Sequence, residues 1–82
     1  MIENETTILE PIVEINAKEV VIQHQASHEN AIYDICSLEG RILITGKFKS
    51  QNTKVNLEGY PNGLYNIYIL DGAEVFKTSF HL

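Results

Sequence analysis

Apolar and polar residues alternate over short stretches along most of the chain, and this period of two is typical of strands with one buried face. The three-four spacing of apolar residues that indicates helices is nearly absent. Clusters of glycine, proline, asparagine and serine separate the alternating stretches. The pattern predicts about seven strands, which cover residues 12–15, 19–24, 30–36, 41–48, 53–57, 64–70 and 73–82.

The residues between the predicted strands favour tight connections. Residues 16–18 separate two apolar runs and predict a hairpin. Gly40 ends the third strand and can adopt a positive φ, and the sequence Pro61-Asn62-Gly63 predicts a compact turn. Asp71-Gly72 is the strongest hairpin signal, because this pair favours a two-residue type I′ loop.

Alternation also assigns the side chains of each strand to faces. Residues 64–70 are apolar on nearly both faces, which is typical of a central strand. Apolar residues of the third strand fall on both faces, which predicts a bulge or a partly covered outer face. The side chains expected to share one face of their strand are Ile42, Ile44 and Phe48; Thr53, Val55 and Leu57; Tyr65, Ile67 and Ile69; and Phe76, Phe80 and Leu82.

Short strands at this spacing, joined by hairpin-length turns, predict an all-β sandwich of about seven short antiparallel strands. The chain has 82 residues, which is enough for one domain. We assign the sandwich to residues 10–82 and predict that residues 1–9, which are mostly polar, form a flexible N-terminal tail or linker. The alternative is an additional edge strand that contains Ile8 and Leu9.

The net charge of −5 argues against a nucleic-acid binder, because such proteins need a basic surface. Lys47, Lys49 and Lys54 form a local concentration of positive charge. We interpret them as lysines that protect a sheet edge from aggregation, and the alternative is a contact surface used by strand addition. No apolar run reaches the roughly 18 residues of a membrane helix, so no membrane insertion is predicted.

Catalytic and cofactor motifs are not found, and we predict neither an enzyme nor a cofactor. His24 and His28 are interpreted as ordinary surface histidines, since their spacing matches a metal pair only on a helix. Cys36 is expected to be a small buried hydrophobe. A site for zinc or calcium is the least favoured hypothesis, and its ligands would be these histidines or the acids near turns, Asp34, Glu39, Asp71 and Glu74.

Two segments and the chain end resemble a known family. Residues 32–35 and 40–43, IYDI and GRIL, are similar to a hairpin of the C-terminal sorting domain of the type IX (Por) secretion system. Residues 55–65, VNLEGYPNGLY, resemble the turn of that family. The closing Asp-Gly hairpin, a lysine near the end and a last residue at position 82 resemble its end. The residues that match the family pattern are Gly40, Pro61, Asn62, Gly63, Tyr65, Asp71, Gly72 and Lys77.

The resemblance implies an immunoglobulin-like sandwich that acts as a non-catalytic sorting and anchoring signal, recognised by a bacterial protein-export machinery. It also implies an exported protein of the cell envelope or the extracellular space, while the residues alone leave a cytoplasmic location open. The alternative function is a stand-alone or appended immunoglobulin-like module for adhesion or protein interaction. The oligomeric state stays open in both cases.

Overall fold

The computed structural model describes residues 10–82, which form seven strands and no helix. The predicted tail and the alternative strand at Ile8 and Leu9 lie outside the described residues. All seven predicted strands are confirmed, with ends that differ by at most two residues. The strands are β1 (Ile12–Asn16), β2 (Glu19–Gln23), β3 (Ile32–Cys36), β4 (Ile42–Lys47), β5 (Asn52–Asn56), β6 (Leu64–Asp71) and β7 (Glu74–His81).

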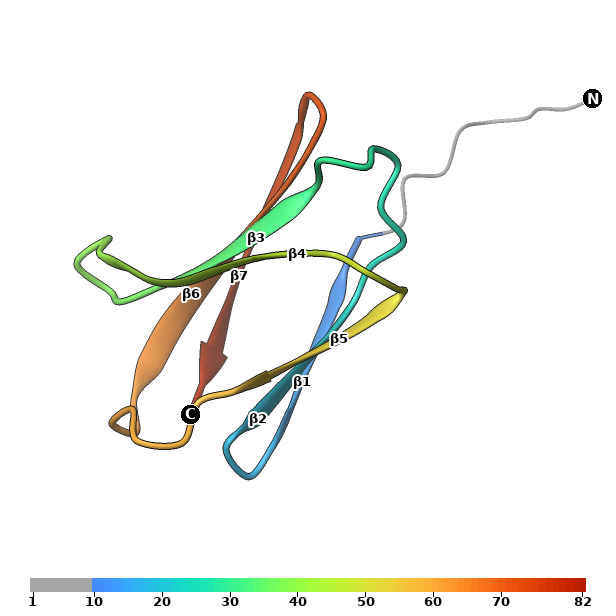
Figure 1. Ribbon diagram of the computed structural model, residues 1–82. Coiled ribbons are helices and arrows are strands. Elements are labelled where there is room, and N and C mark those ends of the chain that lie inside the picture. Colours follow the sequence, from blue (N-terminus) through green and yellow to red (C-terminus); the bar gives the residue numbers. More distant parts are fainter. Residues whose placement is uncertain (1–9) are drawn as a thin grey trace, which may run out of the picture.

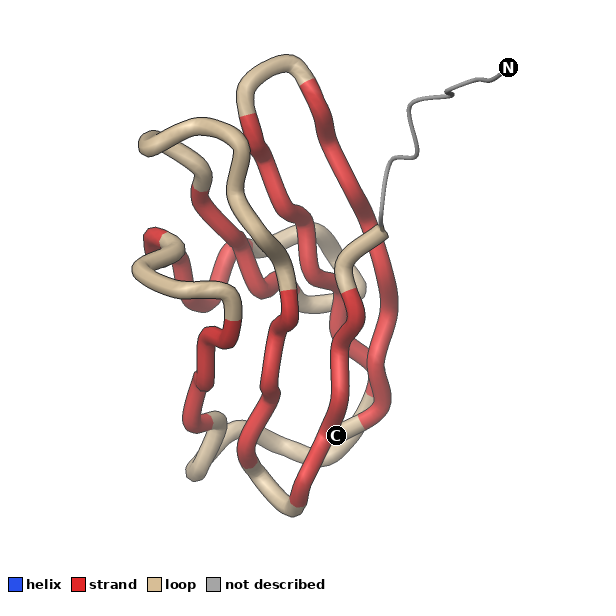
Figure 2. The backbone as a smooth tube through the Cα atoms, turned by 90° about the vertical axis from the view of Figure 1, so that its right-hand side faces the viewer, coloured by secondary structure: helices blue, strands red, loops and turns tan. Residues whose placement is uncertain are grey.

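The strands form two antiparallel sheets that pack as a sandwich (Figure 1). One sheet has the order β1-β2-β5 and the other the order β4-β3-β6-β7. The chain crosses between the sheets after β2, after β4 and after β5. Along one side of the sandwich β1 lies against β7 (Figure 2). The prediction of an all-β sandwich of antiparallel strands is therefore confirmed.

Two-residue loops close the hairpins at opposite ends of the molecule. Asn16 pairs with Glu19, so the loop between β1 and β2 consists of residues 17–18. Asp71 pairs with Glu74 at the other end. The predicted hairpin is thus correct, but its loop consists of residues 72–73 and does not include Asp71, which is the last residue of β6.

Alternation brings the inner faces of both sheets together in one core. The sheet of β1, β2 and β5 contributes Val20, Ile22 and Val55, and Leu57 follows β5. The other sheet contributes Tyr33, Ile35, Tyr65, Ile67, Ile69 and Phe80. Cys36 is buried as well, as predicted, and burial raises the pKa of its thiol. Burial of these apolar surfaces is the main source of stability in so small a domain.

A bulge interrupts the pairing of β3 with β4. Ile35 pairs with Ile44, whereas the next residue, Cys36, pairs with Ile42, so Leu43 is an extra residue in β4. Leu43 and Ile44 consequently both pack against the core, and Ile42 is 58% exposed. The prediction that Ile42 shares the inner face of Ile44 is wrong, because strict alternation does not hold across a bulge. The sequence pattern predicted a bulge or a partly covered outer face for the third strand, whereas the extra residue lies in the fourth strand.

A substitution of Phe80 tests whether the core depends on the last strand. Its side chain is 6% exposed and stacks on Tyr65 with 5.6 Å between the ring centroids. We expect Phe80→Ala to lower the free energy of unfolding by about 3 kcal/mol, because the truncation removes buried surface and leaves a cavity. Val75→Ala in the same strand is the matched control, since Val75 is 62% exposed, and it should change stability by less than about 0.5 kcal/mol. Urea denaturation of both variants measures the difference, and equal stabilities would contradict this description of the core.

Candidate functional site

The residues that match the family pattern lie in four separate parts of the fold. Pro61, Asn62, Gly63 and Tyr65 lie at one end of the sandwich, and Asp71 and Gly72 lie at the other. Gly40 ends the loop between β3 and β4 with a φ of 90°. Lys77 stands in the middle of β7. The structure therefore does not bring these residues together into one site.

The turn of residues 61–63 holds the last residue of the chain. Gly63 donates its N–H to the carbonyl of Leu82 at 3.1 Å, and the N–H of Leu82 donates to the carbonyl of Gly63 at 2.7 Å. Gly63 has a φ of 151°, a conformation that side chains disfavour. Tyr65 has its ring in the core and donates its hydroxyl to the carbonyl of Pro61. The turn and the chain end thus form one hydrogen-bonded unit.

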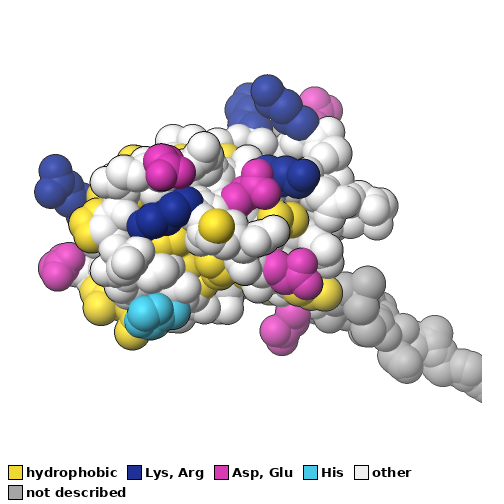
Figure 3. Space-filling model, turned by 90° about the horizontal axis from the view of Figure 1, so that it is seen from below, with side chains coloured by type: hydrophobic (Ala, Val, Ile, Leu, Met, Phe, Trp, Pro, Cys, Tyr) yellow, Lys and Arg dark blue, Asp and Glu magenta, His cyan; other side chains and the backbone are white. Residues whose placement is uncertain are grey.

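Lys18 joins this unit to the other sheet. Its Nζ donates to the carbonyl of Tyr60 and to Oδ1 of Asn62, both at 2.8 Å, and its own carbonyl accepts the N–H of Leu57 at 2.8 Å. Figure 3 views this end of the molecule and shows apolar side chains between charged ones. Sequence reasoning missed the role of Lys18, because its partners are more than 40 positions away.

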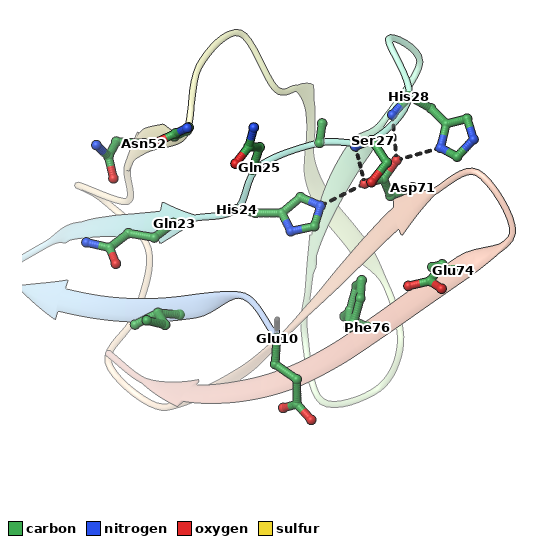
Figure 4. A pocket seen from close by; sticks show the side chains of 13 residues that line it. Glu10, Gln23, His24, Gln25, Ser27, His28, Asn52, Asp71, Glu74 and Phe76 are labelled. Carbon is green, nitrogen blue, oxygen red and sulfur yellow. Dashed lines mark hydrogen bonds and ion pairs between the residues drawn. The ribbon is translucent and has the colours of Figure 1, made fainter. Parts of the chain in front are cut away.

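Asp71 is the centre of a buried polar cluster at the opposite end (Figure 4). Its side chain is 3% exposed. Oδ2 accepts from the backbone N–H of Ser27 at 2.7 Å and lies 3.0 Å from Nε2 of His24. Oδ1 accepts from the backbone N–H of His28 and lies 3.0 Å from Nδ1 of the same residue. A carboxylate is only an acceptor, so both ring nitrogens that face it carry hydrogen.

This cluster corrects the interpretation of His24 as a surface residue. His24 is buried, and its ring lies 5.2 Å from that of Phe48 and 5.7 Å from that of Phe76. His28 does lie at the surface, with a side chain that is 58% exposed. Its ring covers Gly72, where an added Cβ would overlap it. No sequence motif indicates this arrangement, because the loop of residues 25–28 becomes adjacent to Asp71 only through the fold.

The cluster holds the side chain of Asp71 as an ionised carboxylate. Burial by itself raises the pKa of Asp71, but the hydrogen bonds from Ser27, His28 and His24 outweigh it and lower the pKa to about 2. Within residues 10–82 no group of histidine, cysteine and acidic side chains is placed to hold a metal ion. The ring nitrogens here donate to the carboxylate and do not share an open coordination point with it.

An open cleft of about 910 Å³ adjoins the cluster. Its walls include the amide side chains of Gln23, Gln25 and Asn52, and Phe76 contributes apolar surface (Figure 4). Glu10 and Glu74 place two carboxylates at its rim. Beside this cleft, the hydrogen bonds to Asp71 hold the loop of residues 25–28 in place.

Lys77 differs from the other matching residues because its side chain serves neither a turn nor the core. It is exposed on the outer face of β7, with Nζ 5.8 Å from the centroid of the Tyr68 ring. Tyr68 is opposite Lys77 in the β6–β7 register and opposite Asp34 in the β3–β6 register. A cation over an aromatic face at an exposed position contributes only about 0.5–1 kcal/mol. Lys77 is therefore free to contact another molecule.

Gly63 offers a test of the turn. We expect Gly63→Val to lower the free energy of unfolding by more than about 1 kcal/mol, because a β-branched residue is strained at this φ. No atom lies within 4 Å of an added Cβ, so a steric clash would not explain the loss. Thermal unfolding followed by circular dichroism measures it. An unchanged melting curve would mean that the turn does not have this conformation.

Asp71 gives the fold a defined dependence on pH. Its pKa in the folded protein, about 2, lies below the ordinary value of 3.8. The carboxylate therefore stabilises the native state above about pH 4, and this contribution, about 2 kcal/mol, is lost as the pH falls towards 2. Asp71→Asn should lower stability at neutral pH and remove this part of the acid dependence. Glu74→Gln, which changes the exposed carboxylate opposite Asp71, is the control and should keep it. Equal acid profiles for the two variants would contradict the assignment.

The sequence was compared with families of known proteins. The family model for the secretion system C-terminal sorting domain matches residues 9–80, which is nearly the whole chain. A search of the curated proteins found no match. Within the described residues no helix has the length and apolar character needed to cross a membrane. The match covers β1 to β6 in full and β7 up to Phe80, together with the turn at residues 61–63 and the Asp71 cluster. The chain therefore belongs to the family of C-terminal sorting domains of the type IX secretion system.

Proposed function

We propose that this domain is a non-catalytic sorting signal that the type IX export machinery recognises in its folded form. Membership of the family marks the chain as a sorting domain, and thus as part of an exported protein at the cell surface or in the extracellular space. The finer proposal is that recognition needs the assembled sandwich. A linear peptide with the same sequence would then not suffice.

The observation that carries this proposal is how the matching residues are used. Gly63 pairs with Leu82, Tyr65 reaches back to Pro61, and Asp71 fixes the loop after β2. These interactions build the fold, and the side chains of Tyr65 and Asp71 are buried. A machinery that selects for these residues therefore selects for a folded domain, and reads it through surfaces that the fold presents.

The stand-alone or appended interaction module was the alternative from sequence. The family match does not favour this alternative, because it covers residues 9–80, which is nearly the whole sandwich. Our proposal includes contact with a protein partner, namely a component of the export machinery. It includes no chemistry carried out by the domain itself.

A reporter fusion tests the proposal. A fluorescent protein placed ahead of this chain should reach the medium or the cell surface of a bacterium with the type IX machinery, and should stay inside a strain that lacks it. The Gly63→Val variant should be exported less, in proportion to its unfolded fraction, whereas Val75→Ala should be exported like the unchanged domain. Retention of the unchanged fusion would refute the sorting function. Undiminished export of a variant shown to be unfolded would refute recognition of the folded form.

A further inference from the structure

The two long sides of the sandwich are closed differently. On one side β1 lies against β7 (Figure 2). The other side is bordered by the remaining end strands, β4 and β5, which make no such approach to each other. Figure 1 shows β4 and β5 diverging from the short connection that joins them. Within residues 10–82, therefore, no strand covers the free edge of β4.

The backbone of β4 presents hydrogen-bonding groups at this edge in a defined order. Phe48, just after the strand, donates its N–H to the carbonyl of Ala31. Inward-facing and outward-facing groups alternate in an antiparallel ladder, so Ile44 and Gly46 also face β3. Thr45 and Lys47 then direct their N–H and C=O groups away from the sheet. An added strand could pair with these groups.

The side chains of β4 suit an added strand better than those of the other free edges. Its sequence is ILITGK, whereas β5 reads NTKVN and has polar residues at four of its five positions. Ile42 is 58% exposed at the start of β4, and Leu38 in the preceding loop is 59% exposed. The edge of β7 is approached by β1. Of the two edge strands on the open side, β4 is thus the more apolar.

Positive charge surrounds this edge. Arg41 precedes β4, Lys47 ends it and Lys49 follows it, so three of the six cations of the chain lie within nine positions. All three are exposed, and none of them has an ion-pair partner in the part of the chain that is described. The chain as a whole has a net charge of −5. A local basic edge on an acidic protein favours an acidic partner.

We propose that an extended, acidic segment of the export machinery adds to the edge of β4 as a further strand. This inference rests on the proposed sorting function and names the surface and the partner chemistry that it uses. Backbone groups of Thr45 and Lys47 would pair with the added strand, Ile42 would pack against its apolar side chains, and the three cations would attract its carboxylates. A second copy of this chain is disfavoured, because pairing β4 with β4 would bring like charges together.

A synthetic peptide probe tests the edge directly. The probe has the six-residue length of β4 and alternates valine with glutamate. By NMR, the amide protons of Thr45 and Lys47 should exchange at least about tenfold more slowly in its presence, because they become hydrogen-bonded. Binding should weaken as NaCl rises from about 50 to about 500 mM, since screening removes the charge term. Three results would each overturn the proposal. The peptide does not bind, it slows amide exchange in another part of the domain, or a peptide that alternates valine with lysine binds equally well.

Two variants locate the binding to β4. Thr45→Pro removes an outward N–H without breaking a bond to β3, and should weaken peptide binding at least about tenfold. Val75→Pro is the matched control on β7. Gly63 and Leu82 form a hydrogen-bonded pair, and hydrogen-bonded and non-hydrogen-bonded pairs alternate along the β6–β7 register. This alternation places the N–H of Val75 on the outward side of β7. Binding of the peptide to β4 should therefore persist in this control variant. If Thr45→Pro does not fold, Lys47→Glu with Lys49→Glu provides the same test, with Lys54→Glu on β5 as its control.

The export assay separates the two proposals. If the unchanged fusion is exported and the fusion with Lys47→Glu and Lys49→Glu is retained while still folded, the edge is used in export. Equal export of both would refute the edge and leave the sorting function intact. Retention of the unchanged fusion would refute the sorting function itself, whatever the peptide does in solution.

Discussion

One buried carboxylate holds together the part of this fold that the apolar core does not reach. The chain leaves the β1-β2-β5 sheet after β2 and must cross to the other sheet before β3 begins. Asp71, at the end of β6, accepts hydrogen bonds from Ser27, His24 and His28 on that crossing segment. A small sandwich has little apolar surface to spare for its loops, so this anion fixes the path of the crossing. At the other end the cation of Lys18 does the same for the crossing after β5.

The two ends show why the matching residues look like a recognition motif in the sequence and like a scaffold in the structure. Pro61 and Gly63 shape a turn that must meet both Lys18 and Leu82. Asp71 and Gly72 are adjacent because one residue supplies the anion and the next leaves room for the ring of His28. Each of these pairs of residues fixes the connection at one end of the sandwich. In the proposed function, export depends on these residues because an unfolded sandwich presents no ordered surface to its partner.

The sequence predicted the strands well because each has one buried face, and a period of two is a local signal. It failed where geometry depends on distant residues. The bulge at Leu43 places Ile42 at the surface, and only the register with Cys36 reveals it. His24 can be buried because a carboxylate 47 positions away accepts a hydrogen bond from its ring. A local pattern carries no information about such a partner, and the Asp-Gly pair suggested a loop where the structure has a strand end.

The layout of the sheets separates the open edge of β4 from the point where the chain enters the sandwich. The chain enters the sandwich through β1, which lies beside β7 on the closed side. The edge of β4 lies on the opposite side, since β4 and β7 are the two ends of one sheet. The first described strand therefore lies away from β4. The proposed strand addition would therefore take place on the side of the sandwich that lies away from β1.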